Sequence, residues 1–273
     1  MRPRPTPHRS PWPAELRLTL GLRAGKTRVT KQSHRGPLRV QRAFHPEADG
    51  TAHVVVLHPP AGLVGGDSLD VRVDVEEGAS ALVTSTGAAK AYRTWGAPAL
   101  AHTQVHVARG ATMEHVPLEA VVYEGADAEL ETVVHLGEGA RFLGWEVVCL
   151  GRPAAGESFG RGTLRLSLEV WHDGRLCFLE RGRIDGGSDA LEAPWGLAGW
   201  PAFGTMVSTD GDVEMLRRAL EGTDAGVTQV RGLTVVRARG RDGSEVRRRL
   251  ERARDVVRDR WGRPRVTPAI WRS

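Results

Sequence analysis

The chain has 273 residues, 40% of them hydrophobic and 26% charged, which is enough to bury a sizeable core. No run of about 18 apolar residues occurs, and the N-terminus lacks the apolar stretch of a secretory signal, so we expect a cytoplasmic protein rather than a membrane or exported one. The two cysteines, Cys149 and Cys177, form no CxxC pair, which argues against a disulfide framework, a zinc ribbon or a redox site. Each is expected to be a buried, inert thiol.

The formal net charge of +5 hides a contrast along the chain. Residues 1–42 contain eleven Lys or Arg and one acidic residue, and residues 237–272 contain thirteen Arg and five acidic residues. Residues 43–216 instead contain eleven basic and twenty-five acidic residues. The middle of the chain is therefore expected to attract cations.

The first 13 residues are too rich in proline to join a core and are predicted to form a disordered tail. Residues 14–273 contain no linker-like tract and are predicted to form a single domain. Period-two alternation of apolar and polar residues predicts half-buried strands at 69–75 and 164–170. Looser alternation predicts strands at 38–44, 53–57, 103–107, 130–136, 141–150, 175–181 and 232–238. The domain is therefore predicted to be mainly β.

A glycine-alanine pair follows several of these strands. The pairs are Gly78-Ala79, Gly110-Ala111 and Gly139-Ala140, at intervals of 32 and 29 residues, with Gly125-Ala126 between the last two. Glycine can adopt a positive φ and alanine lets the backbone turn closely, so this weak repeat predicts a chain that coils into stacked sheets in the manner of a β-helix. Ordinary hairpin turns in a β-sandwich would give a similar pattern.

A glycine-rich loop, residues 57–67, joins two predicted strands. A phosphate-binding loop would need a helix after it, because the helix N-terminus supplies the amides that hold the phosphate. No helix is predicted there, and Asp67 would repel a phosphate. Asp67 is interpreted either as the cap of a demanding turn or as a functional carboxylate.

Residues 84–93 contain Lys90 and Arg93, two of the few cations in the acidic middle of the chain. Their scarcity indicates specific pairing. A buried or interfacial carboxylate partner would explain both residues without a catalytic role.

Residues 139–152 are apolar enough for a buried strand, yet Glu146 lies in the middle of them. Burying a carboxylate costs free energy unless it is paired, protonated or facing a wet cavity. A wet acidic cavity is a place where a divalent cation could pass or pause. Glu157 follows shortly after in the chain.

About two helices are predicted in the C-terminal third. Asp210 or Asp212 can cap the first, which Gly222 closes. The second has an apolar stripe made of Val246, Leu250, Ala253, Val257 and Trp261.

Arginines fill the opposite face of the second helix, namely Arg247, Arg248, Arg249, Arg252, Arg254 and Arg258. We interpret this face as solvated rather than as a nucleic-acid contact, because Glu251, Asp255 and Asp259 are interspersed with the arginines. No GxSxG, HExxH or phosphate-loop lysine signature occurs, which favours a protein without catalysis of its own.

Three motifs, in their order and spacing, resemble the urease accessory proteins called UreD or UreH. They are His58-Pro59-Pro60 with Gly65-Gly66-Asp67, then Gly87 to Arg93, then Arg141 to Glu146 continuing through Cys149 to Arg152. The likeness extends through Pro201 to Thr205, Gly232 to Arg237 and Pro268 to Trp271, so it covers nearly everything after the N-terminal tail.

The resemblance implies a β-helix-like chaperone without enzymatic activity that helps nickel reach the active site of urease. It would bind apo-urease and recruit UreF and the GTPase UreG, with no tightly bound cofactor, no nucleic acid and no membrane partner. Ni²⁺ would be bound only transiently. Oxygen ligands of moderate affinity suit such passage, because they release a metal that a thiolate or imidazole cluster would retain.

Internal tunnels are proposed to conduct nickel in this family. Carried over by position, the candidate path residues are Asp67, Glu146 and Glu157. The candidates for structural or partner-binding roles are His58, Lys90, Tyr92, Arg93, Arg152 and Trp271. An alternative from a different class is a β-solenoid carbohydrate-active enzyme that uses paired carboxylates as acid and base.

Overall fold

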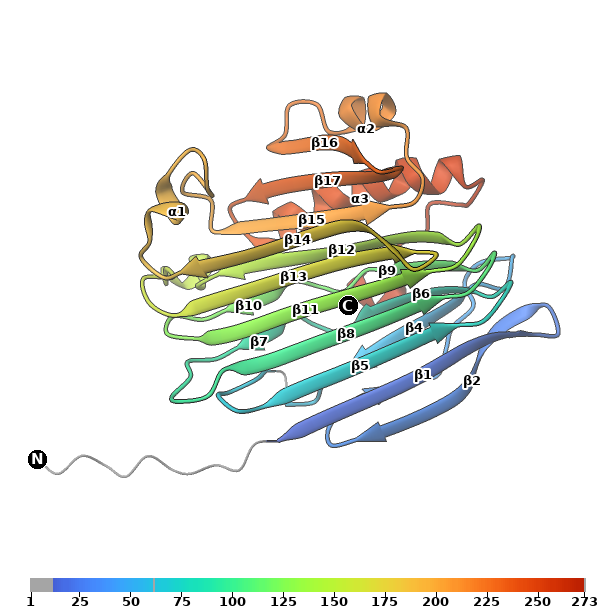
Figure 1. Ribbon diagram of the computed structural model, residues 1–273, viewed down its shortest axis with the longest axis horizontal. Helices are drawn as coiled ribbons and strands as arrows, with labels where there is room; N and C mark the ends of the chain where they lie inside the picture. The colour runs from blue at the N-terminus through green and yellow to red at the C-terminus, as the bar shows by residue number, and fades with distance from the viewer. Residues whose placement is uncertain (1–11, 61, 273) are drawn as a thin grey trace, which may run out of the picture.

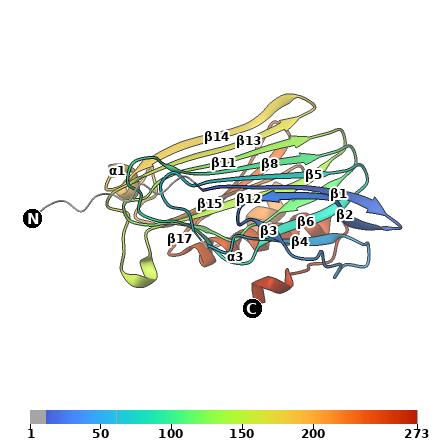
Figure 2. The same ribbon diagram turned by 90° about the horizontal axis from the view of Figure 1, so that it is seen from below.

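The computed structural model describes residues 12–60 and 62–272, which form two stacked β-sheets (Figure 1). Residues 1–11 of the predicted tail lie outside the described residues, whereas Pro13 already begins the first strand. The helix α3 (Gly243–Arg260) packs on one face of the ten-stranded sheet. The seven-stranded sheet, the ten-stranded sheet and this helix therefore form three layers (Figure 2). The predictions of a mainly β fold and of stacked sheets are confirmed.

The seven-stranded sheet is parallel except at its two edges. Its order is β14-β13-β11-β8-β5-β1-β2, and only β2 and β14 run antiparallel to their neighbours. Its strands are β1 (Pro13–Arg23), β2 (Lys26–Arg35), β5 (Ser68–Val75), β8 (Ala99–Val107), β11 (Asp127–Leu136), β13 (Thr163–His172) and β14 (Arg175–Asp185).

The ten-stranded sheet has the main order β16-β17-β15-β12-β9-β6-β4-β3, and two short strands extend it because β10 pairs with β12 and with β7. Its strands are β3 (Arg39–Val40), β4 (Ala52–Leu57), β6 (Ser80–Ser85), β7 (Ala89–Ala91), β9 (Thr112–His115), β10 (Ala120–Val122), β12 (Arg141–Leu150), β15 (Ala202–Ser208), β16 (Ala225–Val230) and β17 (Leu233–Gly240).

The glycine-alanine pairs are the corners at which the chain passes between the sheets. Gly78, Gly110 and Gly139 have φ of 69°, 63° and 65°, and each precedes a buried alanine. These corners carry β5 into β6, β8 into β9 and β11 into β12. Successive corners are also hydrogen-bonded, because the Thr112 amide donates to the Ala79 carbonyl at 2.9 Å. The repeat therefore stacks one coil on the next.

The sequence analysis missed eight strands: β1, β2, β6, β7, β9, β10, β15 and β16. In β1, Leu16, Leu18 and Leu20 alternate with polar residues and are buried, so a period-two signal was present. The short edge strand β16 carries no comparable pattern, and its formation depends on pairing with β17.

Both predicted helices are present, as α2 (Val213–Ala219) and α3 (Gly243–Arg260). Asp212 caps α2 by accepting the Glu214 and Met215 amides. The helix α1 (Asp189–Glu192) and two 3₁₀ turns, Pro153–Ala155 and Ala269–Arg272, were not predicted. Within the described residues, no helix combines the length and the apolar character needed to cross a membrane.

The apolar stripe of α3 is buried against the ten-stranded sheet, as expected. The prediction of a wholly solvated arginine face is wrong, because Arg254 is 2% exposed and Arg258 is fully buried. The physical reason is a set of buried carboxylates beneath the helix. Arg254 and Arg258 both pair with Glu114, and Arg258 also pairs with Glu47.

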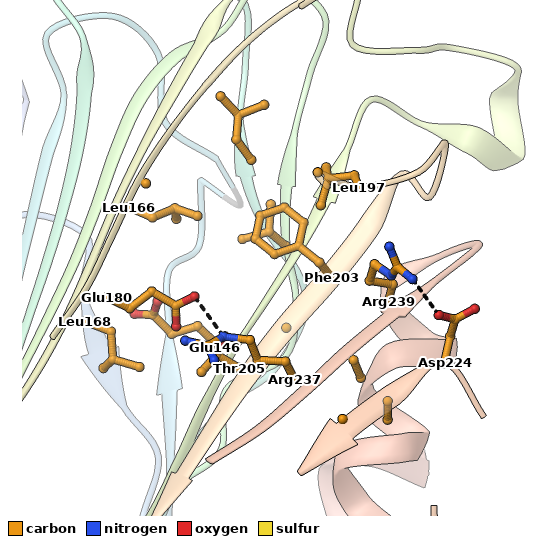
Figure 3. A pocket seen from close by; sticks show the side chains of 18 of the residues that line it. Glu146, Leu166, Leu168, Glu180, Leu197, Phe203, Thr205, Asp224, Arg237 and Arg239 are labelled. Atoms are coloured by element: carbon orange, nitrogen blue, oxygen red, sulfur yellow. Dashed lines mark hydrogen bonds and ion pairs between the residues drawn. The ribbon is translucent and has the colours of Figure 1, made fainter. Parts of the chain in front are cut away.

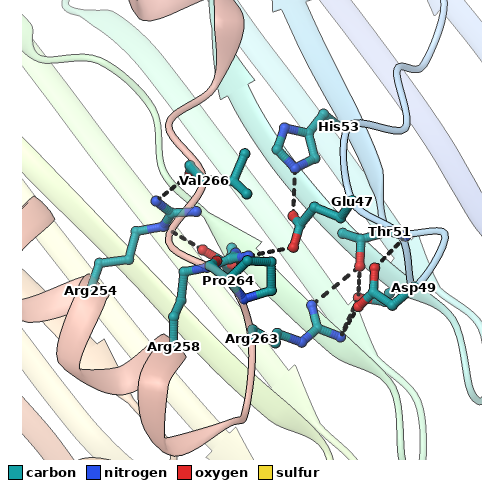
Figure 4. A network of polar contacts seen from close by, with 11 residues as sticks. Glu47, Asp49, Thr51, His53, Arg254, Arg258, Arg263, Pro264 and Val266 are labelled. Carbon is teal, nitrogen blue, oxygen red and sulfur yellow. Dashed lines mark hydrogen bonds and ion pairs between the residues drawn. The ribbon is translucent and has the colours of Figure 1, made fainter.

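This buried charge network also fixes the chain that follows α3 (Figure 4). Arg254 donates to the Val266 carbonyl at 2.9 Å and Arg258 to the Pro264 carbonyl at 2.7 Å. Burial alone would raise the pKa of Glu47, but the hydrogen bond from His53 and the charge of Arg258 outweigh it and hold the pKa below its usual value. The C-terminal segment is therefore held in place by polar contacts.

We expect Arg258→Met to destabilise the fold by about 3–5 kcal/mol, because it leaves two buried carboxylates without this partner. The matched control is Arg252→Met on an exposed position of the same helix, with an expected effect within about 0.5 kcal/mol. Urea unfolding of the two variants measures the difference. Equal effects would show that the network contributes nothing specific.

Candidate functional site

A row of polar side chains separates two apolar core clusters in the space between the sheets. On β11, Val134 belongs to one cluster and Leu130 packs against another, with Thr132 between them. On β12, Phe142 and Val148 likewise belong to these two clusters, with Glu146 between them. On each strand, a polar residue thus lies between the apolar residues that contact these two clusters.

The strand register places these polar residues in one row in each sheet. In the seven-stranded sheet, Thr103, Thr132, Leu168 and Glu180 are successive partners on β8, β11, β13 and β14. In the ten-stranded sheet, Glu146, Thr205 and Arg237 are successive partners on β12, β15 and β17. Two rows with polar members therefore line the space between the sheets.

Two cavities that share lining residues lie beside these rows. The larger, of about 790 Å³, lies between β14 and the strands β15 to β17. The smaller, of about 300 Å³, is lined mainly by β4 to β6, β8 and β11 and by the 85–90 and 117–120 segments. Glu146 and Val148 line both cavities, so Glu146 lies at the boundary between them.

Glu146 is half-buried between the sheets and lines both cavities. Its side chain keeps some accessible surface because it faces the cavities. The pKa of this carboxyl is raised to about 7, chiefly by burial and to a smaller extent by the nearby Glu180, although a hydrogen bond with Thr132 acts to lower it. Near neutral pH, the carboxyl therefore exchanges readily between its protonated and ionised forms.

Glu180 approaches Glu146 from the opposite sheet (Figure 3). One of its oxygens accepts a hydrogen bond from the Arg237 guanidinium at 3.3 Å, and the other has no hydrogen-bond partner among the described residues. Further along β17, Arg239 pairs with Asp224 at 2.8 Å. Among the residues that line the larger cavity, the carboxylates of Glu146 and Glu180 thus lie close to the guanidinium of Arg237.

His115 lines the smaller cavity, and a small pocket brings it together with Thr132 and Glu146. Burial lowers the pKa of His115 to about 4, so its imidazole is neutral at physiological pH. His58 and Lys90 line the same cavity. Burial also lowers the pKa of His58, although Asp67 opposes the shift.

Asp67 does not line either cavity. Its buried carboxylate accepts the Val64 amide at 3.1 Å and the Trp12 amide at 3.3 Å. These bonds tie the glycine-rich loop to the start of β1. The geometry is that of a loop cap, one of the two interpretations drawn from the sequence.

Glu157 forms an ion pair with Arg152 and lines a separate cavity of about 430 Å³. The Arg152 guanidinium lies over the Tyr123 ring at 4.9 Å, and that ring contacts Tyr92 at a centroid distance of 4.9 Å. The fold therefore gathers three sequence candidates, Tyr92, Arg152 and Glu157, into one cluster.

The remaining candidates differ in their surroundings. Within the described part of the chain, neither Lys90 nor Arg93 forms an ion pair with a carboxylate. Of the two predicted partners, a buried carboxylate is therefore absent there, and a carboxylate of another protein stays a prediction. Trp271 donates to the Thr84 hydroxyl at 2.9 Å and packs beside Trp145. The thiol of Cys149 is buried with a pKa raised by burial to about 11, whereas Cys177 is half-buried rather than buried.

The described residues contain no group of three or more His, Cys, Asp or Glu side chains that could hold a metal ion. Sequence analysis found Glu146 but missed Glu180, Arg237 and His115. For Glu180 a signal existed, because it occupies an inward position in a predicted strand that is otherwise apolar on that face.

Comparison with known proteins gives a consistent result. A family model described as UreD urease accessory protein matches residues 13–272. A urease accessory protein UreD of Dechloromonas aromatica (strain RCB) is 38% identical over 98% of this chain and 97% of its own. Those of Azoarcus sp. (strain BH72) and Pseudomonas fluorescens (strain Pf0-1) are 39% and 40% identical over 96% of this chain and over 94% and 95% of their own.

Glu146→Gln should stabilise the fold at pH 8 and have little effect below pH about 4.5. The folded-state pKa of about 7 lies above the usual 4.5, so the wild-type protein loses stability as the pH rises between these values. The full penalty is about 3 kcal/mol. Urea unfolding at several pH values measures it. A difference between variant and wild type that does not vary with pH would contradict the raised pKa.

Asp67→Ala should destabilise the protein by about 1–3 kcal/mol, because the partly buried Val64 amide loses its acceptor. Asp67→Asn keeps one acceptor oxygen and should lose less. Thermal unfolding compares the two variants. If Asp67→Ala were as stable as wild type, the loop would not depend on this cap.

Proposed function

The chain belongs to the UreD urease accessory protein family, and from this premise we propose that it helps to build the nickel centre of urease without catalysis of its own. In this proposal it binds apo-urease in the cytoplasm and recruits UreF and the GTPase UreG. Ni²⁺ is its transient cargo and passes through the space between the two sheets.

The observation that carries the proposal is that Glu146 lines both cavities. A route that crosses the domain needs polar groups between its apolar clusters, because a dication cannot cross an apolar stretch without replacing its hydration. Glu146 supplies a carboxylate there, and Thr132 and the neutral His115 supply further polar atoms beside it.

Weak coordination supports transport rather than storage. Two carboxylates, from Glu146 and Glu180, face the larger cavity, and hard oxygen ligands of this kind bind a borderline metal such as Ni²⁺ only moderately. The neutral imidazole of His115 can add one nitrogen ligand as the ion moves into the smaller cavity. A dication would therefore be handed from one small ligand set to the next.

Asp67 and Glu157 have different parts in this proposal. The carboxylate of Asp67 is occupied by backbone amides, so it would maintain the loop beside His58. The ion pair of Glu157 with Arg152 belongs to a surface cluster that we propose as a partner contact. The relatives are named as accessory proteins, which favours this role over the carbohydrate-active alternative.

The test is urease activation in cells that express urease with its accessory proteins and either wild-type chain or Glu146→Gln. At limiting nickel, the variant should lower the nickel content and activity of urease about tenfold, because the central ionisable oxygen ligand is lost. Co-purification of urease and UreF should stay at the wild-type level.

Glu129→Gln is the matched control, since Glu129 is exposed on the outer side of β11. It should activate urease normally. Activation by Glu146→Gln at the wild-type level would refute the route through the cavities, and loss of co-purification would assign the defect to assembly instead.

A further inference from the structure

Arg237 lines the larger cavity beside the carboxylates of Glu146 and Glu180. It lies on β17 in register with Thr205 and Glu146, and its side chain enters the larger cavity (Figure 3). Its Nε lies 3.3 Å from a Glu180 oxygen. A positive charge thus stands in the cavity beside the two carboxylates that face each other across it.

The ion pair of Arg237 with Glu180 has the properties of a contact that can open. The side chains are 52% and 33% exposed, so water screens their attraction and the pair contributes little to stability. The second oxygen of Glu180 has no hydrogen-bond partner among the described residues. One contact to a half-exposed guanidinium leaves Glu180 incompletely satisfied.

Arg237 also has a second contact close by. Its guanidinium carbon lies 6.0 Å from the centroid of the Phe178 ring, within range of a cation–π interaction. Phe178 is on the same strand as Glu180, two residues earlier. The guanidinium could therefore leave the carboxylate and still keep a favourable contact with β14.

Resting on the proposed nickel passage, we propose that Arg237 is a displaceable counter-ion that competes with a divalent cation for Glu180. An arriving dication takes the carboxylate and displaces the guanidinium toward Phe178 and solvent. When the guanidinium returns to Glu180, it repels the ion and promotes its release. Arg237 is thus a residue that sets affinity and release, while the carboxylates are the ligands.

The need for such a residue follows from electrostatics. Two carboxylates that share a partly desolvated cavity add a Coulomb attraction to the moderate affinity of their oxygen atoms for the metal, because Coulomb interactions grow as the effective dielectric constant falls. Tight binding would stop transfer. A single mobile positive charge offsets part of this attraction without blocking the space, which a rigidly buried cation could not do.

Arg239 provides a matched control. It lies two residues further along β17 and lines the same cavity, but its partner is Asp224 at 2.8 Å. Its side chain is 33% exposed. Substituting either arginine removes one positive charge from the same cavity, so any difference reports the specific contact with Glu180.

The experiment measures Ni²⁺ binding by the purified full-length chain in complex with UreF, using competition with a metal-sensitive dye, and Ni²⁺ release to a chelator by stopped flow. Arg237→Gln should bind Ni²⁺ about tenfold more tightly and release it more slowly, because the competing charge is gone. Arg239→Gln and Arg237→Lys should both remain near wild type. The double variant Arg237→Gln with Glu180→Gln should lose the gain.

Equal affinities for Arg237→Gln and Arg239→Gln would overturn the proposal, as would a gain that persists without Glu180 or an Arg237→Gln variant with no measurable Ni²⁺ binding. These outcomes differ from failure of the proposed function, which Glu146→Gln tests through urease activation. If Glu146→Gln impairs urease activation while Arg237→Gln leaves the Ni²⁺ affinity unchanged, the counter-ion role of Arg237 is rejected and the proposed route is kept. Normal activation by Glu146→Gln with tighter binding by Arg237→Gln would support the counter-ion and reject the route.

Discussion

The parallel register of the stacked strands is the constraint on which the candidate site depends. Each coil of the chain adds one strand to each sheet, and the glycine corners keep successive coils in step. A polar residue at one level of a strand therefore lies beside the same level of the next. Thr103, Thr132 and Glu180 come from distant parts of the sequence and still form part of one row.

Two kinds of charged group occur inside this fold, and they have different physical states. Glu47 and Glu114 are buried beneath α3, and the buried arginines Arg254 and Arg258 of this helix form ion pairs with them. Such a network is costly to break, so it fixes the helix and the C-terminal segment. Glu146 instead faces cavities and has no arginine partner among the described residues, which leaves it free to change its protonation or its ligand.

A conduit for a metal ion has to balance attraction against release. The acidic middle of the sequence supplies the attraction, and the structure places a few of these acids on the inner faces of the sheets. Other acidic residues form ion pairs away from this space, such as Asp74 with Arg72 on β5. The space between the sheets therefore holds far less negative charge than the composition of residues 43–216 indicates. The positive charge of Arg237 lowers this net negative charge further.

The sequence by itself determined the β class, the stacked-coil corners, the two C-terminal helices and the family resemblance, because these depend on local periodicity, glycine conformation and contiguous motifs. It also identified Glu146, since a carboxylate in an apolar strand is a local anomaly. Tertiary structure alone decided that Asp67 caps its loop, that Arg258 is buried and that Arg237 faces Glu180. The physical reason is that burial and pairing depend on strand register and layer contacts between residues far apart in the chain, which local patterns do not encode.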